Sequence, residues 1–348
     1  MKKISMKDIA RELNISITTV SFVINGKSKE KSISVATVKK VNDLISKNGF
    51  KPNNAARILR TGKSKTIGLI VEDIGNYFFG NVAKVIEIAA NRNGYNVFYS
   101  STENNVNTAK ELINKMKNSS VDGFIITATQ GLEEELENLA KENIPFVLLD
   151  RLVPGIETNY VILDNFSGAN ELTNHLLTNG YDNIGFISII SEMSQMVDRK
   201  NGFLDALAQA NVEIAEKAIL EVNFGENREN IIAAIKGHIS KNPQLDALFF
   251  ATNYLGVLGI EALQQSNLSI PKDMAVVCFD DNELFRLLSP SISVVSQPIE
   301  EIATQSINLL LKIIKNGPKP SQEPIGEIIQ PNLIVRKSSP LKKLPSLA

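Results

Sequence analysis

From residue 67 onward, short apolar runs alternate with longer amphipathic stretches, and this alternation limits the possible folds more than any other feature of the chain. Apolar runs of strand length are typical of parallel strands buried on both faces, and the amphipathic stretches are typical of the helices that cover them. The pattern runs to about residue 149 and starts again near residue 167. It predicts an α/β body of two doubly wound parallel sheets, hence two lobes with a ligand cleft at the carboxyl ends of the strands. The predicted strands are residues 67–71, 96–100, 123–127, 146–149, 184–189, 247–251 and 275–279.

The net charge of −1 conceals a strong difference between the two ends of the chain. Residues 1–63 contain 14 Lys and Arg against four acidic residues, a net charge of +10, and the remainder carries −11. A basic head on an acidic body favours binding to phosphate groups. A solvated, lysine-rich surface is the alternative interpretation of the same charge. Sequence motifs are needed to distinguish it from a phosphate-binding surface.

The composition predicts a globular protein of the cytoplasm with two or three domains. Of 348 residues, 43% are hydrophobic and 22% charged, as in ordinary globular chains. No apolar run approaches the roughly 18 residues that span a bilayer, so no membrane partner is expected. Residues 1–8 lack the apolar stretch of a signal peptide, and the single cysteine, Cys278, is compatible with a reducing compartment.

Two short amphipathic segments near the start of the chain predict a helix-turn-helix. The periodicity indicates helices over residues 6–13 and 17–25, with Ser16 as N-cap of the second, and a third helix over residues 35–47 capped by Ser34. A generic helical hairpin would show the same periodicity, but the basic charge favours DNA binding. The amino-terminal half of the second helix would face base edges and phosphates as a recognition helix, exposing Ile17, Thr18, Thr19, Ser21 and Phe22.

This region resembles the lactose-repressor (LacI/GalR) family of transcription regulators. The matching residues are Met6-Lys7-Asp8-Ile9-Ala10, Thr19-Val20-Ser21, Asn25-Gly26, Lys51-Pro52-Asn53, Ala56-Arg57 and Leu59-Arg60-Thr61-Gly62. The resemblance implies a headpiece over residues 1–49 and a hinge helix over residues 50–63 that forms on operator DNA. Its Leu59 would wedge into a central minor-groove step; an ordinary linker leucine is the alternative. The predicted DNA contacts are Ser5, Ser16, Ile17, Thr18, Thr19, Ser21, Phe22, Asn25, Asn53, Ala56 and Leu59.

Phe22 departs from the family pattern, which most often has Arg after Thr-Val-Ser. Phe cannot make the bidentate contact to guanine that Arg makes, but it can touch a thymine methyl group. We therefore expect an operator half-site that does not require guanine at the base facing Phe22. The following loop, residues 26–33, looks longer than usual and adds lysines that are expected to meet backbone phosphates.

For the body, the resemblance implies a periplasmic-binding-protein-like domain over residues 64–336 that binds an effector and forms a homodimer. Lobe 1 would contain about residues 64–162 and 293–323, and lobe 2 about residues 163–292 and 324–336, so that several crossovers form a hinge. The last segment, residues 337–348, holds three Ser and two Pro and is expected to be a loose tail.

The resemblance also implies roles for individual residues of the cleft. An arginine would fix the polar groups of the ligand through its planar fork, acids would bind hydroxyls, and aromatic rings would form the walls. Core packing of the aromatics and a surface ion pair for the arginine are the alternatives. Tyr254 stands where the family often has Asp, which removes an acceptor for sugar hydroxyls, so the identity of the effector is not inherited. The predicted effector residues are Tyr77, Phe78, Asp150, Arg199, Phe224, Asn253 and Asp280.

These observations predict a transcriptional repressor whose affinity for operator DNA is controlled by a small molecule, a sugar or sugar derivative. An enzyme is the first alternative, but His175 and His238 are the chain's only histidines and no nucleophile elbow or dinucleotide fingerprint is present. No Cys/His cluster predicts a metal, and no cofactor is expected. A periplasmic-type sugar-binding protein is the second alternative; it would share the body but not the basic head. Whether the ligand releases or tightens DNA binding stays open.

Overall fold

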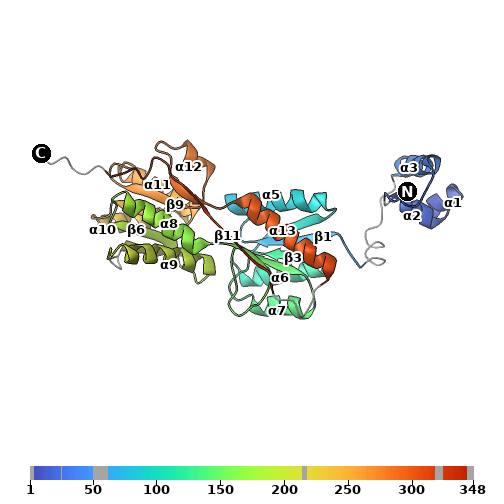
Figure 1. The fold of residues 1–348 in the computed structure, drawn as a ribbon, viewed down its shortest axis with the longest axis horizontal. Helices are drawn as coiled ribbons and strands as arrows, with labels where there is room; N and C mark the ends of the chain where they lie inside the picture. Colours follow the sequence, from blue (N-terminus) through green and yellow to red (C-terminus); the bar gives the residue numbers. More distant parts are fainter. Residues whose placement is uncertain (1–3, 25, 50–61, 214–217, 318–323, 343–348) are drawn as a thin grey trace. The chain divides into compact units, whose positions relative to one another are not determined.

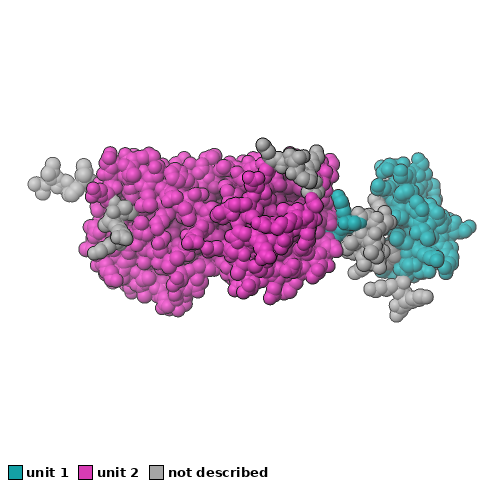
Figure 2. All heavy atoms as spheres, turned by 90° about the horizontal axis from the view of Figure 1, so that it is seen from below, with its two compact units in different colours: residues 1–64 teal, residues 65–348 magenta. Residues whose placement is uncertain are grey.

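The computed structural model describes residues 4–24, 26–49, 62–213, 218–317 and 324–342. The chain divides into two compact units, residues 1–64 and residues 65–348, which are coloured teal and magenta in Figure 2. The boundary between them falls directly after the predicted hinge segment. Among the described residues, no helix combines the length and the apolar character that crossing a membrane requires.

The described part of the first unit consists of α1 (Met6–Glu12), α2 (Ile17–Ile24) and α3 (Val35–Asn48). Ser16 Oγ accepts the N–H of Thr19 at 2.9 Å, and Ser34 Oγ accepts the N–H of Thr37 at 3.2 Å. Both predicted N-caps are therefore confirmed, and each satisfies a backbone donor that the helix itself leaves unpaired. The helices enclose a small apolar core that includes Ile9, Ala10, Val20, Val23, Val41 and Leu44.

Lobe 1 of the second unit is a parallel sheet covered on both faces (Figure 1). One face packs against α5 (Tyr77–Arg92) and α13 (Ile299–Asn316). The other packs against α6 (Val106–Asn118) and α7 (Glu133–Lys141). The strand order is β11-β5-β4-β3-β1-β2. The strands are β1 (Thr66–Val71), β2 (Asn96–Ser101), β3 (Gly123–Ile126), β4 (Phe146–Leu149), β5 (Tyr160–Leu163) and β11 (Gly326–Ile329).

Lobe 2 repeats this arrangement with the strand order β12-β10-β9-β8-β6-β7, and β12 is antiparallel to β10. Its strands are β6 (Ile184–Ile189), β7 (Ile219–Val222), β8 (Ala247–Phe250), β9 (Ala275–Phe279), β10 (Ser293–Ser296) and β12 (Asn332–Ile334). Its helices are α8 (Asn165–Thr178), α9 (Ser194–Gln209), α10 (Arg228–Lys241), α11 (Asn253–Gln265) and the short α12 (Glu283–Leu287). The predicted two-lobed, doubly wound fold is therefore confirmed.

The crossovers between the lobes differ from the prediction in two places. Residues 293–296 were expected in lobe 1, but β10 pairs in parallel with β9 and belongs to lobe 2. Residues 326–329 were expected in lobe 2, but β11 pairs with β5 and belongs to lobe 1. In these two places the chain passes to the other lobe only after β10 and after β11. Each strand first pairs with the strand beside it, because this pairing satisfies its backbone hydrogen-bonding groups. The pattern of side chains along one strand does not reveal which edge it joins.

Strands β5 and β7 are absent from the predicted strands, as are β10, β11 and β12, for which only the lobe was predicted. β7 lies at the edge of its sheet, and three of its four side chains are half-buried or exposed, so it has no continuous apolar run. β5 alternates between half-buried and buried residues. Short strands with this pattern are difficult to distinguish from loops by periodicity.

The predicted loose tail was wrong for residues 337–342. Ser338 and Ser339 are fully buried. Ser338 Oγ accepts the N–H of Ser293 at 2.8 Å and donates to the carbonyl oxygen of Val276 at 2.6 Å. The Tyr181 hydroxyl donates to the carbonyl of Pro340 at 2.9 Å. Ser338 in this segment therefore hydrogen-bonds to backbone groups of lobe 2, a role that a composition rich in Ser and Pro does not reveal.

Helices α8 and α9 pack so closely at Gly202 that a single added methyl group is expected to destabilise the protein. A Cβ atom added at Gly202, on α9, would lie 2.2 Å from the carbonyl oxygen of Phe166 on α8. Gly202→Ala is therefore expected to destabilise the protein by about 3 kcal/mol, because the backbones of two packed helices have to separate. Gly237→Ala on α10 is the control, since nothing lies within 4 Å of its added Cβ; it should be neutral or stabilising by about 0.5–1 kcal/mol. Denaturant unfolding measures both, and equal stabilities of the two variants would contradict the packing argument.

Candidate functional site

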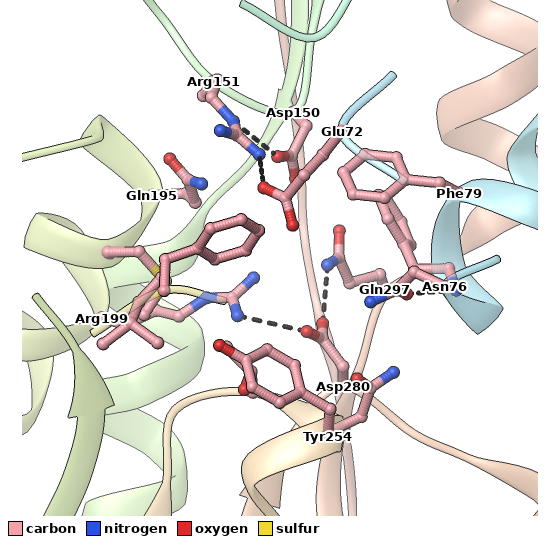
Figure 3. Close-up of a pocket in the computed structure, with 16 residues that line it drawn as sticks. Glu72, Asn76, Phe79, Asp150, Arg151, Gln195, Arg199, Tyr254, Asp280 and Gln297 are labelled. Carbon is pink, nitrogen blue, oxygen red and sulfur yellow. Dashed lines mark hydrogen bonds and ion pairs between the residues drawn. The ribbon is translucent and has the colours of Figure 1, made fainter. Parts of the chain in front are cut away.

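A cleft lies where the carboxyl ends of strands from the two sheets face one another, and its walls come from both lobes (Figure 3). This is the place where doubly wound sheets bind ligands. About 470 Å³ of the cleft is not filled by protein atoms. The lining residues are Glu72, Asn76, Phe78, Phe79, Asp150, Arg151, Ile189, Gln195, Met196, Arg199, Phe224, Thr252, Asn253, Tyr254, Asp280 and Gln297.

Arg199, near the start of α9, is held by groups from three other elements. Its Nε donates to Asn165 Oδ1 at 2.9 Å. Its Nη1 donates to the carbonyl oxygen of Ala251 at 2.7 Å and to Asp280 Oδ2 at 3.2 Å. The guanidinium also lies 3.8 Å from the ring centroid of Phe279. Because Arg199 is only 3% exposed, these contacts offset the cost of burying its charge.

Arg151, the second residue after β4, is held in the same way by groups of lobe 1. Its Nη2 donates to Glu72 Oε2 at 2.6 Å, its Nη1 to Asn104 Oδ1 at 3.0 Å, and its Nε to Asp150 Oδ2 at 3.3 Å. Asn104 Nδ2 donates to the same Glu72 oxygen at 2.8 Å. Figure 3 shows the guanidinium of Arg151 directed towards Glu72 and Asp150. Each of the three nitrogens of this guanidinium therefore donates a hydrogen bond within the protein.

Asp150 and Asp280 occupy equivalent positions in the two lobes, each directly after the third strand from the same end of its sheet. Both have left-handed backbone conformations, with φ of 73° and 72°, which Asp tolerates better than most residues. Burial raises the pKa of the Asp150 carboxyl, and the charges of Arg151 and Arg199 oppose that rise. Asp280 also accepts a hydrogen bond from Gln297 Nε2 at 2.6 Å.

Aromatic rings supply the apolar walls of the cleft. Phe78 and Phe79 lie in the first turn of α5, and their rings meet edge to face with centroids 5.0 Å apart. Phe224 follows β7, and Tyr254 lies at the start of α11. Burial, followed by the charge of Glu72, raises the pKa of Tyr254, so its hydroxyl remains protonated and can donate or accept a hydrogen bond.

Two further hydrogen bonds join the lobes outside the lining residues. Gln130 Nε2, after β3, donates to Glu192 Oε2, after β6, at 2.8 Å. The N–H of Leu152 donates to Ser194 Oγ, at the start of α9, at 3.0 Å. The lobes are therefore in direct contact across the cleft in this conformation.

Most of the predicted effector residues are brought together by the fold. Phe78, Asp150, Arg199, Phe224, Asn253 and Asp280 all line the cleft. Tyr77 does not: it is 39% exposed and lines a neighbouring pocket formed mainly by residues 280–286 and 296–299. Consecutive residues at the start of a helix point in different directions, so Phe78 and Phe79 enter the cleft and Tyr77 does not.

Five further lining residues were not predicted from the sequence: Glu72, Asn76, Phe79, Gln195 and Gln297. Glu72 directly follows a predicted strand, so its position was an available signal. Gln195 precedes Arg199 by one helical turn and shares its face of α9. Gln297 was not predicted to line the cleft because β10, which it follows, was expected in lobe 1. Arg151, which was not among the predicted effector residues, is a buried member of the lining.

The headpiece exposes part of the predicted recognition surface. Ile17 is 47% exposed and Thr18 is exposed, whereas Thr19 and Ser21 are half-buried. Phe22 was expected to be exposed but is half-buried, and the ammonium group of Lys31 lies 5.7 Å from its ring centroid. Lys31 comes from the loop after α2, so that loop shields the ring. The predicted contacts Asn25, Asn53, Ala56 and Leu59 lie outside the described residues.

Neither histidine lies among the residues that line the cleft. His175 Nε2 is 2.8 Å from Ser339 Oγ, and burial lowers the pKa of its imidazole. His238 is buried on α10, and burial lowers its pKa as well. Within the described part of the chain, no group of three or more His, Cys, Asp or Glu could hold a metal ion.

Comparisons with known proteins match both units. Residues 5–53 match the family described as bacterial regulatory proteins, lacI family, and residues 173–339 match a periplasmic binding protein-like domain. Catabolite control protein A of Priestia megaterium is 29% identical over 310 residues, covering 89% of this chain and 92% of that protein. The ribose operon repressor of Haemophilus influenzae is 28% identical over 334 residues, covering 96% of this chain and 98% of that protein.

Solved structures share the fold over almost the whole chain. The lac repressor dimer, bound to operator and the anti-inducer ONPF, superposes with a TM-score of 0.84 at 20% identity and covers 97% of this chain and 100% of that one. The transcriptional regulator CelR in complex with cellobiose gives a TM-score of 0.70 at 24% identity, covering 96% of this chain and 99% of that one. At these identities the likeness shows the fold alone.

The two matched domains stand in the order that the charge and the helix-turn-helix predicted, and full-length relatives are named as transcriptional regulators and repressors. The chain therefore joins a DNA-binding domain of the lacI family of bacterial regulatory proteins to a periplasmic binding protein-like domain, which is the organisation of a DNA-binding transcriptional repressor.

Proposed function

We propose that this repressor acts in the cytoplasm as a homodimer on pseudo-palindromic operator DNA, and that a sugar or sugar derivative bound between its lobes changes its affinity for that DNA. The observation that carries the proposal is the network around Arg199. It joins the floor of the cleft to the crossovers between the lobes, so a ligand in the cleft acts directly on the hinge.

The headpiece supports the DNA-binding part of the proposal. Ile17 and Thr18 are exposed at the amino-terminal end of α2, where a recognition helix meets base edges. Residues 1–63 carry a net charge of +10, which favours contact with backbone phosphates. In the proposed complex, Asn53 and Ala56 contact the DNA and the two Leu59 side chains of the dimer meet at the centre of the operator.

The chemistry of the cleft supports a sugar-like effector. Carboxylates, amides and an arginine fork lie between aromatic walls, a combination that suits hydroxyl groups on an apolar ring. Among the structural relatives, CelR is in complex with cellobiose, and a LacI family regulator from Enterococcus faecium has bound ribose. The proposed contacts are Phe78, Asp150, Arg199, Phe224, Asn253 and Asp280.

The crossovers explain how binding would be transmitted. Asn165, which accepts from Arg199, begins α8 directly after the first crossover. Gln297, which donates to Asp280, lies in the second crossover between β10 and α13. A ligand that hydrogen-bonds to Arg199 or Asp280 competes with these contacts and therefore has different affinities for different lobe arrangements. Residues 50–63 connect lobe 1 to the headpiece, so a change in lobe 1 would reach the DNA-binding unit.

Phe22 determines which base can be read at its position in the half-site. In selection from random duplexes, the wild-type protein should enrich a palindromic site with no required guanine opposite Phe22. Phe22→Arg should add a guanine preference of about 1–3 kcal/mol at that position, because Arg makes a bidentate contact to guanine. Val35→Arg is the control: it adds the same charge at an exposed position of α3 and should change affinity alike for all sequences. A guanine that the wild type requires and Phe22→Ala loses would contradict this assignment.

The same selected duplex tests the electrostatic part of binding. Affinity should fall by about 10³–10⁵ between 50 and 200 mM salt if six to ten phosphates are contacted. A fluorescence titration over that range measures the slope. No sequence preference at any salt concentration would overturn the DNA-binding function itself.

The cleft should bind a sugar measurably. A screen of monosaccharides and disaccharides by thermal shift should yield a ligand that stabilises the protein by about 2.7 kcal/mol at 100 times its dissociation constant. Arg199→Lys should abolish this shift while retaining DNA binding without ligand, because Lys keeps the charge but cannot reach Asn165, Ala251 and Asp280 together.

Arg228→Lys is the matched control, since Arg228 is an exposed partner of Glu261 on the outer helices of lobe 2. It should leave the ligand shift unchanged. The sign of regulation follows from adding the same ligand to the protein–DNA complex in a mobility-shift titration. Release indicates an inducer, and tightening indicates a corepressor.

A further inference from the structure

We propose that Glu72 makes the cleft selective for an uncharged, hydroxyl-rich effector by occupying Arg151, so that ligands carrying a phosphate or carboxylate group are excluded. This inference rests on the proposed function only in taking the cleft as the effector site. It concerns the ionic character of the cleft, which can be measured without knowing the effector.

The lining of the cleft contains more acidic than basic residues. Its charged lining residues are the acids Glu72, Asp150 and Asp280 and the bases Arg151 and Arg199. Each arginine is paired within the protein: Arg199 with Asp280, and Arg151 with Glu72 and Asp150. An anionic ligand therefore meets no arginine without a carboxylate partner, and it would have to displace a carboxylate to obtain one.

Glu72 is the acid that holds Arg151 most closely. Its Oε2 accepts from Arg151 Nη2 at 2.6 Å and from Asn104 Nδ2 at 2.8 Å. The Arg151 side chain is 2% exposed and that of Glu72 is 14% exposed, so little water screens the pair and its Coulomb attraction is stronger than on the surface. Without the charge of Glu72, Asp150, at 3.3 Å, would be the one carboxylate among the described residues still paired with Arg151, since its other partner, Asn104, is uncharged.

The protonation of Asp150 does not change this conclusion. Burial raises the pKa of Asp150, and a protonated Asp150 would leave the two remaining acids balanced by the two arginines. An ionised Asp150 would leave one negative charge in excess. In both states the cleft has no surplus positive charge to attract a phosphate or a carboxylate.

The polar group left without a partner also favours a ligand that donates hydrogen bonds. Gln195 is 7% exposed, and its Oε1 has no hydrogen-bond partner among the described residues. An unpaired buried oxygen is costly and is satisfied only by a donor. A ligand hydroxyl can donate to it, whereas an ionised carboxylate or a fully ionised phosphate can only accept.

Glu72→Gln tests the role of the charge with little change in shape. Gln retains an oxygen that can accept from Arg151 and Asn104, so the variant should fold. Glu103→Gln is the matched control: Glu103 is exposed, does not line the cleft, and its N–H donates to the carbonyl oxygen of Glu72 at 2.9 Å. It removes the same charge beside the cleft without freeing Arg151.

Sulfate is a suitable probe because it carries two negative charges at neutral pH. Thermal unfolding of the full chain would be followed over a sulfate titration at constant ionic strength, with chloride as the exchanged anion. General salt effects and binding to the basic headpiece are common to all variants. The wild type and Glu103→Gln should therefore give the same curve. Glu72→Gln should show an additional saturable stabilisation, with sulfate bound at least about tenfold more tightly.

The double variant Glu72→Gln/Arg151→Gln locates that additional site and should lose it. The proposal is overturned if Glu72→Gln responds to sulfate as the wild type does, or if its gain persists in the double variant. It is also overturned if a sugar acid or sugar phosphate stabilises the wild type more than the corresponding neutral sugar. These outcomes do not depend on DNA binding, so a failure here is distinct from a failure of the proposed regulation.

Discussion

The buried guanidinium of Arg199 is the contact on which the organisation of the body depends. It draws together the start of α8, the end of β8 and the end of β9, and it stacks on the ring of Phe279 within the sheet. A charge this deeply buried has to be fully paired, since an uncompensated one costs several kcal/mol. The same requirement fixes the positions of Asn165 and Asp280, and through Asp280 that of Gln297. Cleft and hinge are therefore parts of one hydrogen-bond network.

The two lobes place an aspartate at the same point of the cleft, but the residue that follows it pairs with different partners in each lobe. In each, an aspartate in the left-handed conformation ends the third strand from the same end of the sheet and faces the cleft. In lobe 1 the next residue is Arg151, which turns back to Glu72 and Asn104. In lobe 2 the next residue is Asp281, which forms a two-point ion pair with Arg336 from the segment after β12. The repeat therefore preserves the backbone geometry of the site, while each lobe pairs its charges locally.

This local pairing suits a regulatory site. A cleft whose charges are already satisfied does not force the lobes apart when it is empty, and the direct contacts of Gln130 with Glu192 and of Leu152 with Ser194 hold them together. A ligand then acts by exchanging one set of hydrogen bonds for another. Such an exchange changes free energy by a few kcal/mol, which is the scale of coupling between sites in allosteric proteins.

Local patterns determined much of this protein. The serines before α2 and α3 predicted helix starts because a cap acts within three residues, and the apolar runs predicted the central strands because each is buried on both faces. These features depend on neighbours along the chain, which any single sequence displays. The predicted cleft residues, by contrast, came from the resemblance to the LacI family and not from the local pattern.

The tertiary structure alone decided the features that depend on distant partners. Glu72 and Arg151 are 79 residues apart and become a pair only when β1 and β4 lie in one sheet. Strands β10 and β11 belong to sheets other than those expected. Because Gln297 directly follows β10, its place in the cleft was not predicted either. Ser338 and Ser339, which looked like part of a loose tail, became buried partners of Ser293. In each case the deciding energy is that of pairing polar groups removed from water, and no spacing along the chain encodes which distant group will be the partner.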